Sequence, residues 1–185
     1  TRTPFIVMEY IEGTTLEALG RGERVPLERA LELVEQVAEA LDYAHERGIV
    51  HRDIKPANIM YEPESDQVKV ADFGIARITD SSKTKTGMVL GTPSYMSPEQ
   101  LSGKKVDGRS DLFSLAVSLY QMLCGKLPFE GDSMAQLMFR IANENPPDIR
   151  TINPGIPDAL VGFLFNGYLF AVVTLGCRCF LCLKL

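Results

Sequence analysis

The chain has 185 residues, a formal net charge of −5 and a hydrophobic content of 45%. This length and composition suffice for one domain with a substantial core, so a disulfide framework is not expected from the four cysteines. The acidic balance gives no reason to expect nucleic-acid binding, which usually depends on a clustered basic face.

The N-terminal part of the chain predicts a strand and a short helix. Strand-forming residues fill the run FIVMEY at 5–10, and a turn follows at 11–13. Thr14 and Glu17 have the spacing of a capping box, in which each side chain bonds to the backbone of the other residue. A helix should therefore begin here and end near Gly20.

Two elements in the middle of the chain are predicted from periodicity. A long helix is expected from Pro26 to Gly48, because apolar residues recur at helical spacing along this stretch. A hairpin should follow, in which 58–61 pairs with 68–70 through a turn near 64–66.

The second half of the chain alternates between irregular and helical segments. The stretch 74–99 has little periodicity and many polar residues, which in a compact domain usually means a functional or mobile segment. A buried helix is predicted at 110–124, where apolar residues occur nearly all round. Another is predicted at 133–143, with Ser133 and Gln136 as its capping box.

Two short motifs carry the chemistry. The first is HRDIKPAN at 51–58, and the second is DFG at 72–74, on the far side of the predicted hairpin. An Asp or Asn in a loop usually just caps a turn, so either motif alone would be a weak signal. Together, in this order and at this separation, they resemble the catalytic loop and the metal-binding motif of protein kinases.

The resemblance runs from about Phe5 to about Asp158. GTPSYMSPE at 91–99 looks like the end of a kinase activation segment, and DGRSDLFS at 107–114 looks like the start of the central helix of the C-terminal lobe. The wording of HRDIKPANIM and GTPSYMSPEQ resembles bacterial serine/threonine kinases. The resemblance implies the α+β protein-kinase-like fold, represented by its C-terminal lobe only, mainly α-helical with short β-hairpins.

The resemblance also divides the chain. Residues 1–13 would be the end of the N-terminal lobe and the hinge. Residues 14–158 would be the C-terminal lobe, with the activation segment at 72–99, and 159–185 would be an atypical hydrophobic tail.

The implied reaction is transfer of the γ-phosphoryl group of ATP to serine or threonine hydroxyls of proteins. It needs an acceptor for the hydroxyl proton and cations that neutralise the phosphates. Asp53 would be the base, and Lys55 would neutralise the transferred group. Asn58 and Asp72 would be the ligands of Mg²⁺, a hard cation that keeps waters and phosphate oxygens in its shell.

Further roles are implied around the nucleotide and the loop. Met8 would be the gatekeeper, and the backbone groups of Glu9 and Ile11 would bond adenine. Met60 would form the floor of the adenine pocket, although plain core packing is the alternative for the apolar residues. Asp111 would hydrogen-bond the backbone of the catalytic loop. Structural or regulatory roles are implied for His51, Arg52, Phe73, Gly74, Thr92, Glu99 and Asp111.

The acceptor type and two modification sites also follow from the resemblance. Lys55 and Thr92 favour serine or threonine over tyrosine as the acceptor. Thr84 and Thr86 lie in the middle of the activation segment near basic residues, and we expect them to be autophosphorylation sites in the complete enzyme, where a kinase homodimer could modify itself. An ordinary polar loop is the alternative.

The chain departs from the family pattern at both ends. No Gly-rich loop and paired lysine precede the hinge, so the N-terminal lobe is expected to be absent and this fragment alone to be inactive. After Asp158 no helix carries the arginine that should pair with Glu99. A buried carboxylate without that partner would be costly.

The tail at 159–185 has three explanations. Nearly every residue of 159–177 is apolar, over a length close to that needed to span a bilayer. A shift of reading frame or an assembly error would explain the abrupt change of composition, which we favour. A membrane segment fits the length and the basic flank. A rearranged core helix is the third, weakened by Gly162, Gly167 and Gly176.

Three functions follow from these features. We favour serine/threonine phosphorylation by a complete kinase. A truncated, non-catalytic lobe that binds substrates or partner kinases is the alternative, and a small-molecule kinase of related fold is the third, against which the long segment 72–99 argues. Protein substrates are the expected partners, without nucleic acid. The use of ATP implies a cytoplasmic catalytic side, with membrane anchoring left open.

Overall fold

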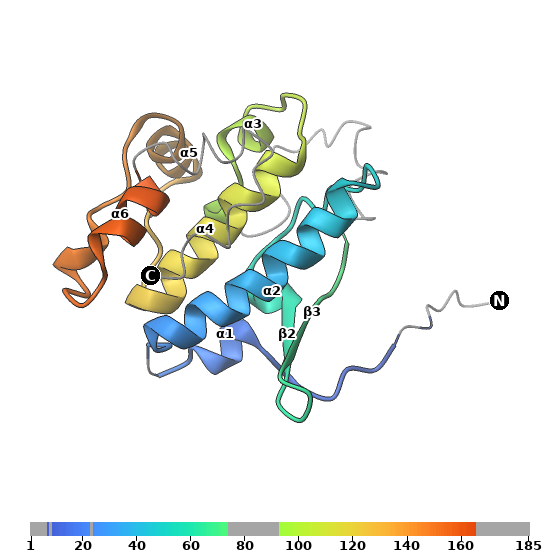
Figure 1. The fold of residues 1–185 in the computed structure, drawn as a ribbon. Coiled ribbons are helices and arrows are strands. Elements are labelled where there is room, and N and C mark those ends of the chain that lie inside the picture. Colours follow the sequence, from blue (N-terminus) through green and yellow to red (C-terminus); the bar gives the residue numbers. More distant parts are fainter. Residues whose placement is uncertain (1–6, 8, 23, 74–92, 166–185) are drawn as a thin grey trace.

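Two long helices, α2 (Leu27–His45) and α4 (Gly108–Cys124), lie side by side at the centre of the fold (Figure 1). The structure is a computed structural model that describes residues 7, 9–22, 24–73 and 93–165. One face of α2 packs into the same core as α4, whose side chains are buried along most of its length. The residues that α2 buries are Ala30, Leu33, Val34, Val37, Leu41 and Ala44.

A small antiparallel sheet lies beside α2. Its strands are β1 (Thr14–Thr15), β2 (Ile59–Glu62) and β3 (Gln67–Val70), in that order. β2 and β3 pair along their full length, which confirms the predicted hairpin. Just before β1 the chain passes so close to β2 that a Cβ atom at Gly13 would lie 2.2 Å from the carbonyl oxygen of Tyr61, so only glycine fits there.

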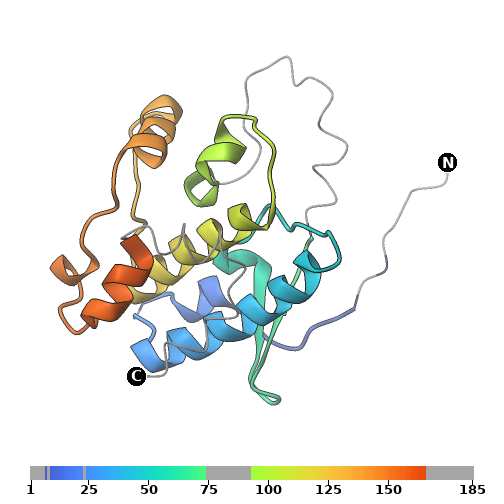
Figure 2. The same ribbon diagram turned by 45° about the horizontal axis from the view of Figure 1, so that its top comes forward.

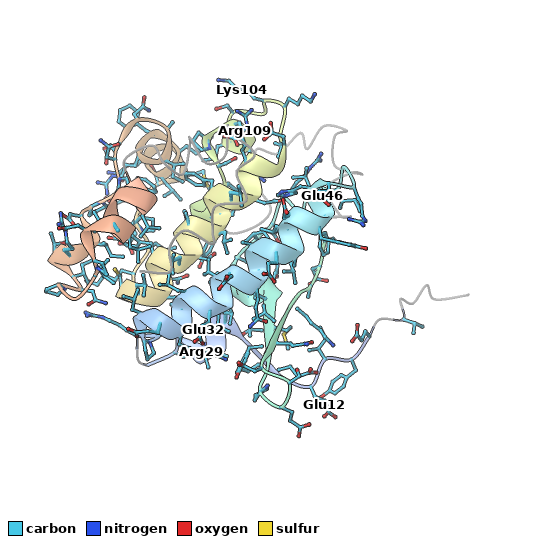
Figure 3. The ribbon with its side chains drawn as sticks, in the orientation of Figure 1. Glu12, Arg29, Glu32, Glu46, Lys104 and Arg109 are labelled. Carbon is cyan, nitrogen blue, oxygen red and sulfur yellow. The ribbon has the colours of Figure 1, made fainter. Side chains whose placement is uncertain are left out.

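The turn of the hairpin is anchored to the outer face of α2. Arg29 lies beside Glu32 there (Figure 3), with Nη1 2.8 Å from a Glu32 carboxylate oxygen, and its Nη2 donates to Asp66 in the turn. Gln36, two turns along, donates to the Asp66 carbonyl at 3.1 Å and accepts from the Val68 amide at 2.8 Å. These bonds fix where β3 begins, and β3 leads towards the DFG motif.

The remaining elements are short helices on the surface of this core. Figures 1 and 2 place α3 and α5 across α4 from α2. A second, smaller apolar cluster involves α5 and consists of Phe129, Leu137 and Ile141. With η denoting a 3-10 helix, these elements are α1 (Leu16–Leu19), η1 (Pro56–Asn58), η3 (Pro93–Tyr95), α3 (Pro98–Leu101), α5 (Met134–Asn143), η4 (Ile149–Thr151) and α6 (Asp158–Phe165).

The three helices predicted from periodicity are confirmed as α2, α4 and α5, but both capping boxes need correction. The cap of α1 is Thr15 rather than Thr14, because α1 begins at Leu16, and Thr15 Oγ1 accepts from the Ala18 amide at 3.1 Å. The predicted box at the start of α5 is half formed. Ser133 accepts from the Gln136 amide at 3.2 Å, whereas the Gln136 side chain accepts from the amide of Asp132.

The predicted strand at 5–10 is wrong where it can be compared. Of this run the structure describes residues 7, 9 and 10, and they have no regular secondary structure. A strand needs a paired neighbour. Val7 is 85% and Tyr10 is 84% exposed, so within the described residues no second strand covers them.

The start of the hydrophobic tail belongs to the core. Leu160 and Leu164 of α6 are buried in the same cluster as α2 and α4, as the explanation by a core helix requires for this part of the tail. Residues 166–185 lie outside the described part. Within the described ranges, no helix is long and apolar enough to cross a membrane.

Candidate active site

Asp111 on α4 holds the backbone of the loop at 51–58. Its Oδ2 accepts from the His51 amide at 2.8 Å and its Oδ1 accepts from the Arg52 amide at 2.6 Å, so it bonds the backbone of the loop as the kinase resemblance implies. Asp111 is fully buried, and Nε2 of His45, at the end of α2, lies 2.8 Å from the same Oδ2. Arg52 has a φ of 69°, a conformation that costs a non-glycine residue about 1–3 kcal/mol. The carboxylate therefore stabilises a strained turn.

Two polar side chains of the loop converge on one carboxylate. Oδ2 of Asp53 accepts from Lys55 Nζ at 2.8 Å and from Asn58 Nδ2 at 2.9 Å, and the same Nδ2 lies 2.8 Å from the Asp53 carbonyl oxygen. The side chains of Asp53 and Lys55 are 32% and 20% exposed, so the pair is oriented by the protein and still open to a reactant. The predicted base, cation and one predicted metal ligand thus lie together.

Asp72 follows β3 and is tied to the loop through its two neighbours. Ala71 donates its amide to the Asn58 carbonyl at 2.9 Å, and its own carbonyl lies 2.9 Å from Nε2 of His51. The rings of His51 and Phe73 are 4.7 Å apart between centroids. Asp72 itself is exposed and has a φ of 58°. His51 therefore links the HRD and DFG motifs, and the chain turns sharply at Asp72.

Asn58 and Asp72 offer oxygen atoms that suit Mg²⁺. Asn58 uses Nδ2 to hold Asp53, which leaves its Oδ1 to face a cation, and Asp72 offers an exposed carboxylate. Two such ligands fit Mg²⁺, which commonly takes one or two protein oxygens and completes its shell with water and phosphate. Among the described residues, no three His, Cys, Asp or Glu side chains gather into a metal site.

The residues predicted around adenine are only partly described. Ile11 and Met60 are half-buried, and Met60 lies on β2 opposite Thr15. Glu9 is exposed, and its carboxylate accepts from Lys69 Nζ at 2.8 Å. Their contacts with a nucleotide stay predictions. Five further predicted residues lie outside the described part of the chain: Met8, Gly74, Thr84, Thr86 and Thr92.

Glu99 has a hydrogen-bond partner, contrary to the expectation that it would be left poorly compensated. It lies in the first turn of α3, and Oγ of Ser110 on α4 donates to its carboxylate. A bond to Asp107 raises the pKa of Arg109, and Glu99 adds a smaller effect in the same direction. Figure 3 shows Arg109 and Lys104 at the connection between α3 and α4. Within the described residues, a hydroxyl and a nearby cation thus accompany the Glu99 carboxylate.

Two contacts of the site were not predicted from the sequence. His45 meets Asp111, and Gln100 Nε2 donates to the carbonyl of Arg52 at 2.8 Å. A local signal for part of this arrangement exists, because Ser-Pro-Glu-Gln at 97–100 has the spacing of a capping box with proline in the first turn. The box is present in α3, where both reciprocal bonds form.

Comparison with known proteins identifies the family. The protein kinase domain model matches residues 1–158, so the chain belongs to the protein kinase family and has its fold. A probable serine/threonine-protein kinase of Streptomyces coelicolor is 46% identical over 165 residues, which cover 85% of this chain and 24% of that protein. The kinase pkn3 of Myxococcus xanthus is 49% identical over 152 residues, or 77% of this chain and 28% of that protein. The predicted resemblance to bacterial serine/threonine kinases is confirmed.

A solved structure supports the protein-kinase-like fold. The crystal structure of Rad53 1–466 in complex with AMP-PNP matches with a TM-score of 0.71 and 27% identity, over 88% of this chain and 40% of that one. Of the two curated bacterial relatives above, the chain spans about a quarter of the length.

Proposed function

We propose that this chain carries the phosphoryl-transfer residues of a serine/threonine protein kinase. As part of a complete kinase, it would transfer the γ-phosphoryl group of ATP to serine or threonine hydroxyls of proteins. The observation that supports this best is the Asp53 carboxylate, which Lys55 and Asn58 hold in a loop anchored to α4. Protein kinases achieve catalysis mainly by positioning and electrostatic stabilisation, and this loop provides both.

Each residue of the site has a role in the proposal. Asp53 accepts the proton of the attacking hydroxyl, because its carboxylate is oriented by two donors and remains open to the reactant. Lys55, with Nζ 2.8 Å from that carboxylate, contributes positive charge beside the transferred group. Asn58 and Asp72 would hold Mg²⁺, which neutralises phosphate charge when it is bound.

The proposal assigns residues 14–158 to the C-terminal lobe and 1–13 to the end of the N-terminal lobe and the hinge. Adenine would bond the backbone of Glu9 and Ile11, between Met8 and Met60. The AMP-PNP bound to the similar Rad53 structure supports nucleotide binding by this fold. The use of ATP favours a cytoplasmic catalytic side, and autophosphorylation, in a homodimer, would fall on residues 84 and 86.

A chimera would test the proposal. Residues 1–158 would replace the aligned segment of the Myxococcus xanthus relative, which then supplies the rest of the kinase. We expect ATP-dependent labelling of a general protein substrate. Asp53→Asn should lower the rate about 10²- to 10⁴-fold, the usual contribution of a general base. Asp42→Asn, on an exposed site of α2, is the matched control and should leave the rate unchanged.

The outcomes separate the two readings of the chain. An active chimera that loses activity only with Asp53→Asn supports the kinase proposal, and phosphopeptide mass spectrometry of that protein tests Thr84 and Thr86. A folded chimera without activity, beside an active parent, would favour the non-catalytic binding module. Equal rates for the Asp53 and Asp42 variants would show that Asp53 is not the general base.

A further inference from the structure

Arg52 has both of its polar backbone groups held by side chains from other elements. Its amide donates to Asp111 Oδ1 at 2.6 Å, and its carbonyl accepts from Gln100 Nε2 at 2.8 Å. That carbonyl belongs to the peptide unit that leads into Asp53. The amide of the same unit, on Asp53, donates to Nδ1 of His51 at 3.2 Å. Gln100 thus acts on the peptide that carries the proposed base.

Gln100 can hold this peptide because its own position is fixed. It is the third residue of α3, and its Oε1 accepts from the amide of Ser97 at 3.1 Å. Ser97 is fully buried, and its hydroxyl lies 3.0 Å from that of Ser110 on α4. The same helix carries Asp111 one residue further. The first turn of α4 therefore anchors α3 through Ser110 and the loop through Asp111. Gln100 adds a direct bond between α3 and the loop.

We propose that Gln100 is a positioning residue for the reaction: its side-chain amide fixes the orientation of the Arg52–Asp53 peptide and thereby aims the Asp53 carboxylate. This role rests on the proposed kinase function of Asp53, although the bond itself can be tested without activity. The left-handed φ of 69° at Arg52 makes the role necessary, because such a conformation is retained only where the surroundings over-determine it. Asp111 fixes one side of Arg52, and Gln100 fixes the other.

The chemistry of Gln100 allows a selective test. Gln100→Glu keeps an oxygen that can accept from the Ser97 amide, because glutamate serves in a capping box as well as glutamine does. A carboxylate in the first turn also suits the helix dipole. What the variant loses is the donor to the Arg52 carbonyl, which then faces a second acceptor. α3 should therefore stay folded while the bond to the loop is broken.

Gln136→Glu is the matched control. Gln136 is the third residue of α5, and Ser133 accepts from its amide at 3.2 Å. Its Oε1 accepts from the Asp132 amide at 2.8 Å, so the same change of amide to carboxylate keeps the accepted bond. Both bonds of Gln136 join it to residues just before α5, and the control therefore tests the chemistry of the change alone.

Hydrogen exchange on the full chain is the first measurement. In Gln100→Glu, the amides of Arg52 and Asp53 should exchange about fivefold faster or more, as for the loss of one ordinary hydrogen bond. Amides of α2 should change less than those of the loop, and the melting temperature should fall by no more than about 2–4 °C, the shift expected when a chain of this size loses about 1 kcal/mol. In the chimera described above, the variant should lower kcat about five- to thirtyfold and leave KM for ATP within about twofold, because the base is misaimed while nucleotide binding is untouched.

Each result has a clear meaning. Exchange in the loop equal to that of wild type and of Gln136→Glu would overturn the proposal. So would exchange that is faster to the same degree in the loop and in α2, because Gln100 would then be merely structural. An active chimera in which kcat is unchanged would overturn the role in the reaction. A wild-type chimera without activity would contradict the kinase function instead, and the exchange data alone would then decide whether Gln100 holds the loop.

Discussion

Replacing Asp111 by Asn should destabilise the chain by about 2–4 kcal/mol. The carboxylate meets three groups, with distances of 2.6 Å to the Arg52 amide, 2.8 Å to the His51 amide and 2.8 Å to Nε2 of His45. Asparagine keeps one acceptor oxygen, and its NH₂ group must face one of the two backbone donors. His45 can change tautomer and accept a hydrogen bond from this NH₂ group. A backbone N–H can only donate, so the backbone amide that faces the NH₂ group loses its acceptor.

The magnitude follows from the donor that is left without a partner. A buried, unsatisfied amide costs about 1–3 kcal/mol, and the remaining bond loses about 1 kcal/mol because its acceptor is no longer charged. Urea unfolding followed by far-UV circular dichroism would measure the change, since the chain contains no tryptophan to report by fluorescence.

Asp107→Asn is the control for this measurement. Asp107 caps the same helix, is 48% exposed and pairs with Arg109 at 2.9 Å. Asparagine is an equally good cap, and an exposed ion pair contributes at most about 1 kcal/mol. If the two variants unfold within about 0.5 kcal/mol of each other, the argument that Asp111 anchors the loop is refuted.

Two further predictions use the same unfolding assay. Gly108→Ala should destabilise the chain by about 1–3 kcal/mol, although alanine favours helices, because the new Cβ would lie 2.6 Å from the His45 ring. Gly155→Ala is the control and should be nearly neutral, because the nearest atom to its Cβ would be 3.6 Å away. Burial raises the pKa of Cys124 from 9.0 to about 11. The unfolded chain then loses the thiol proton first, so stability should fall as pH rises from about 9 to 11; Cys124→Ala should flatten this fall, and an unchanged slope would contradict the assignment.

Much of the local structure could be predicted from the sequence. The hairpin between Asn58 and Asp72 has short apolar strands and a turn near 64–66, which are local signals. α2 and α4 were predictable because their apolar residues follow the helical period or fill the whole helix surface. Lys55 and Asp53 are two residues apart in one loop, so their pairing needed little tertiary information.

The contacts between distant segments could not be predicted from residue patterns. His45 and Asp111 are 66 positions apart, and Gln100 and Arg52 are 48 positions apart. Such pairs depend on how α2, α3 and α4 pack, which periodicity does not specify. The Ser110 hydroxyl that donates to Glu99 was missed for the same reason, because the family pattern led us to expect an arginine as the partner.

The bonds between the loop and Asp111 also bear on how the protein is made, because they join residues 60 and 59 positions apart. A ribosome that adds about 5–20 residues per second needs about 3–12 s to cover that separation. Contacts of long sequence separation also close slowly during folding, since loop-closure entropy opposes them. A nascent chain that stops before residue 111 would therefore carry the complete HRD motif in its sequence without the anchor that gives the motif its geometry.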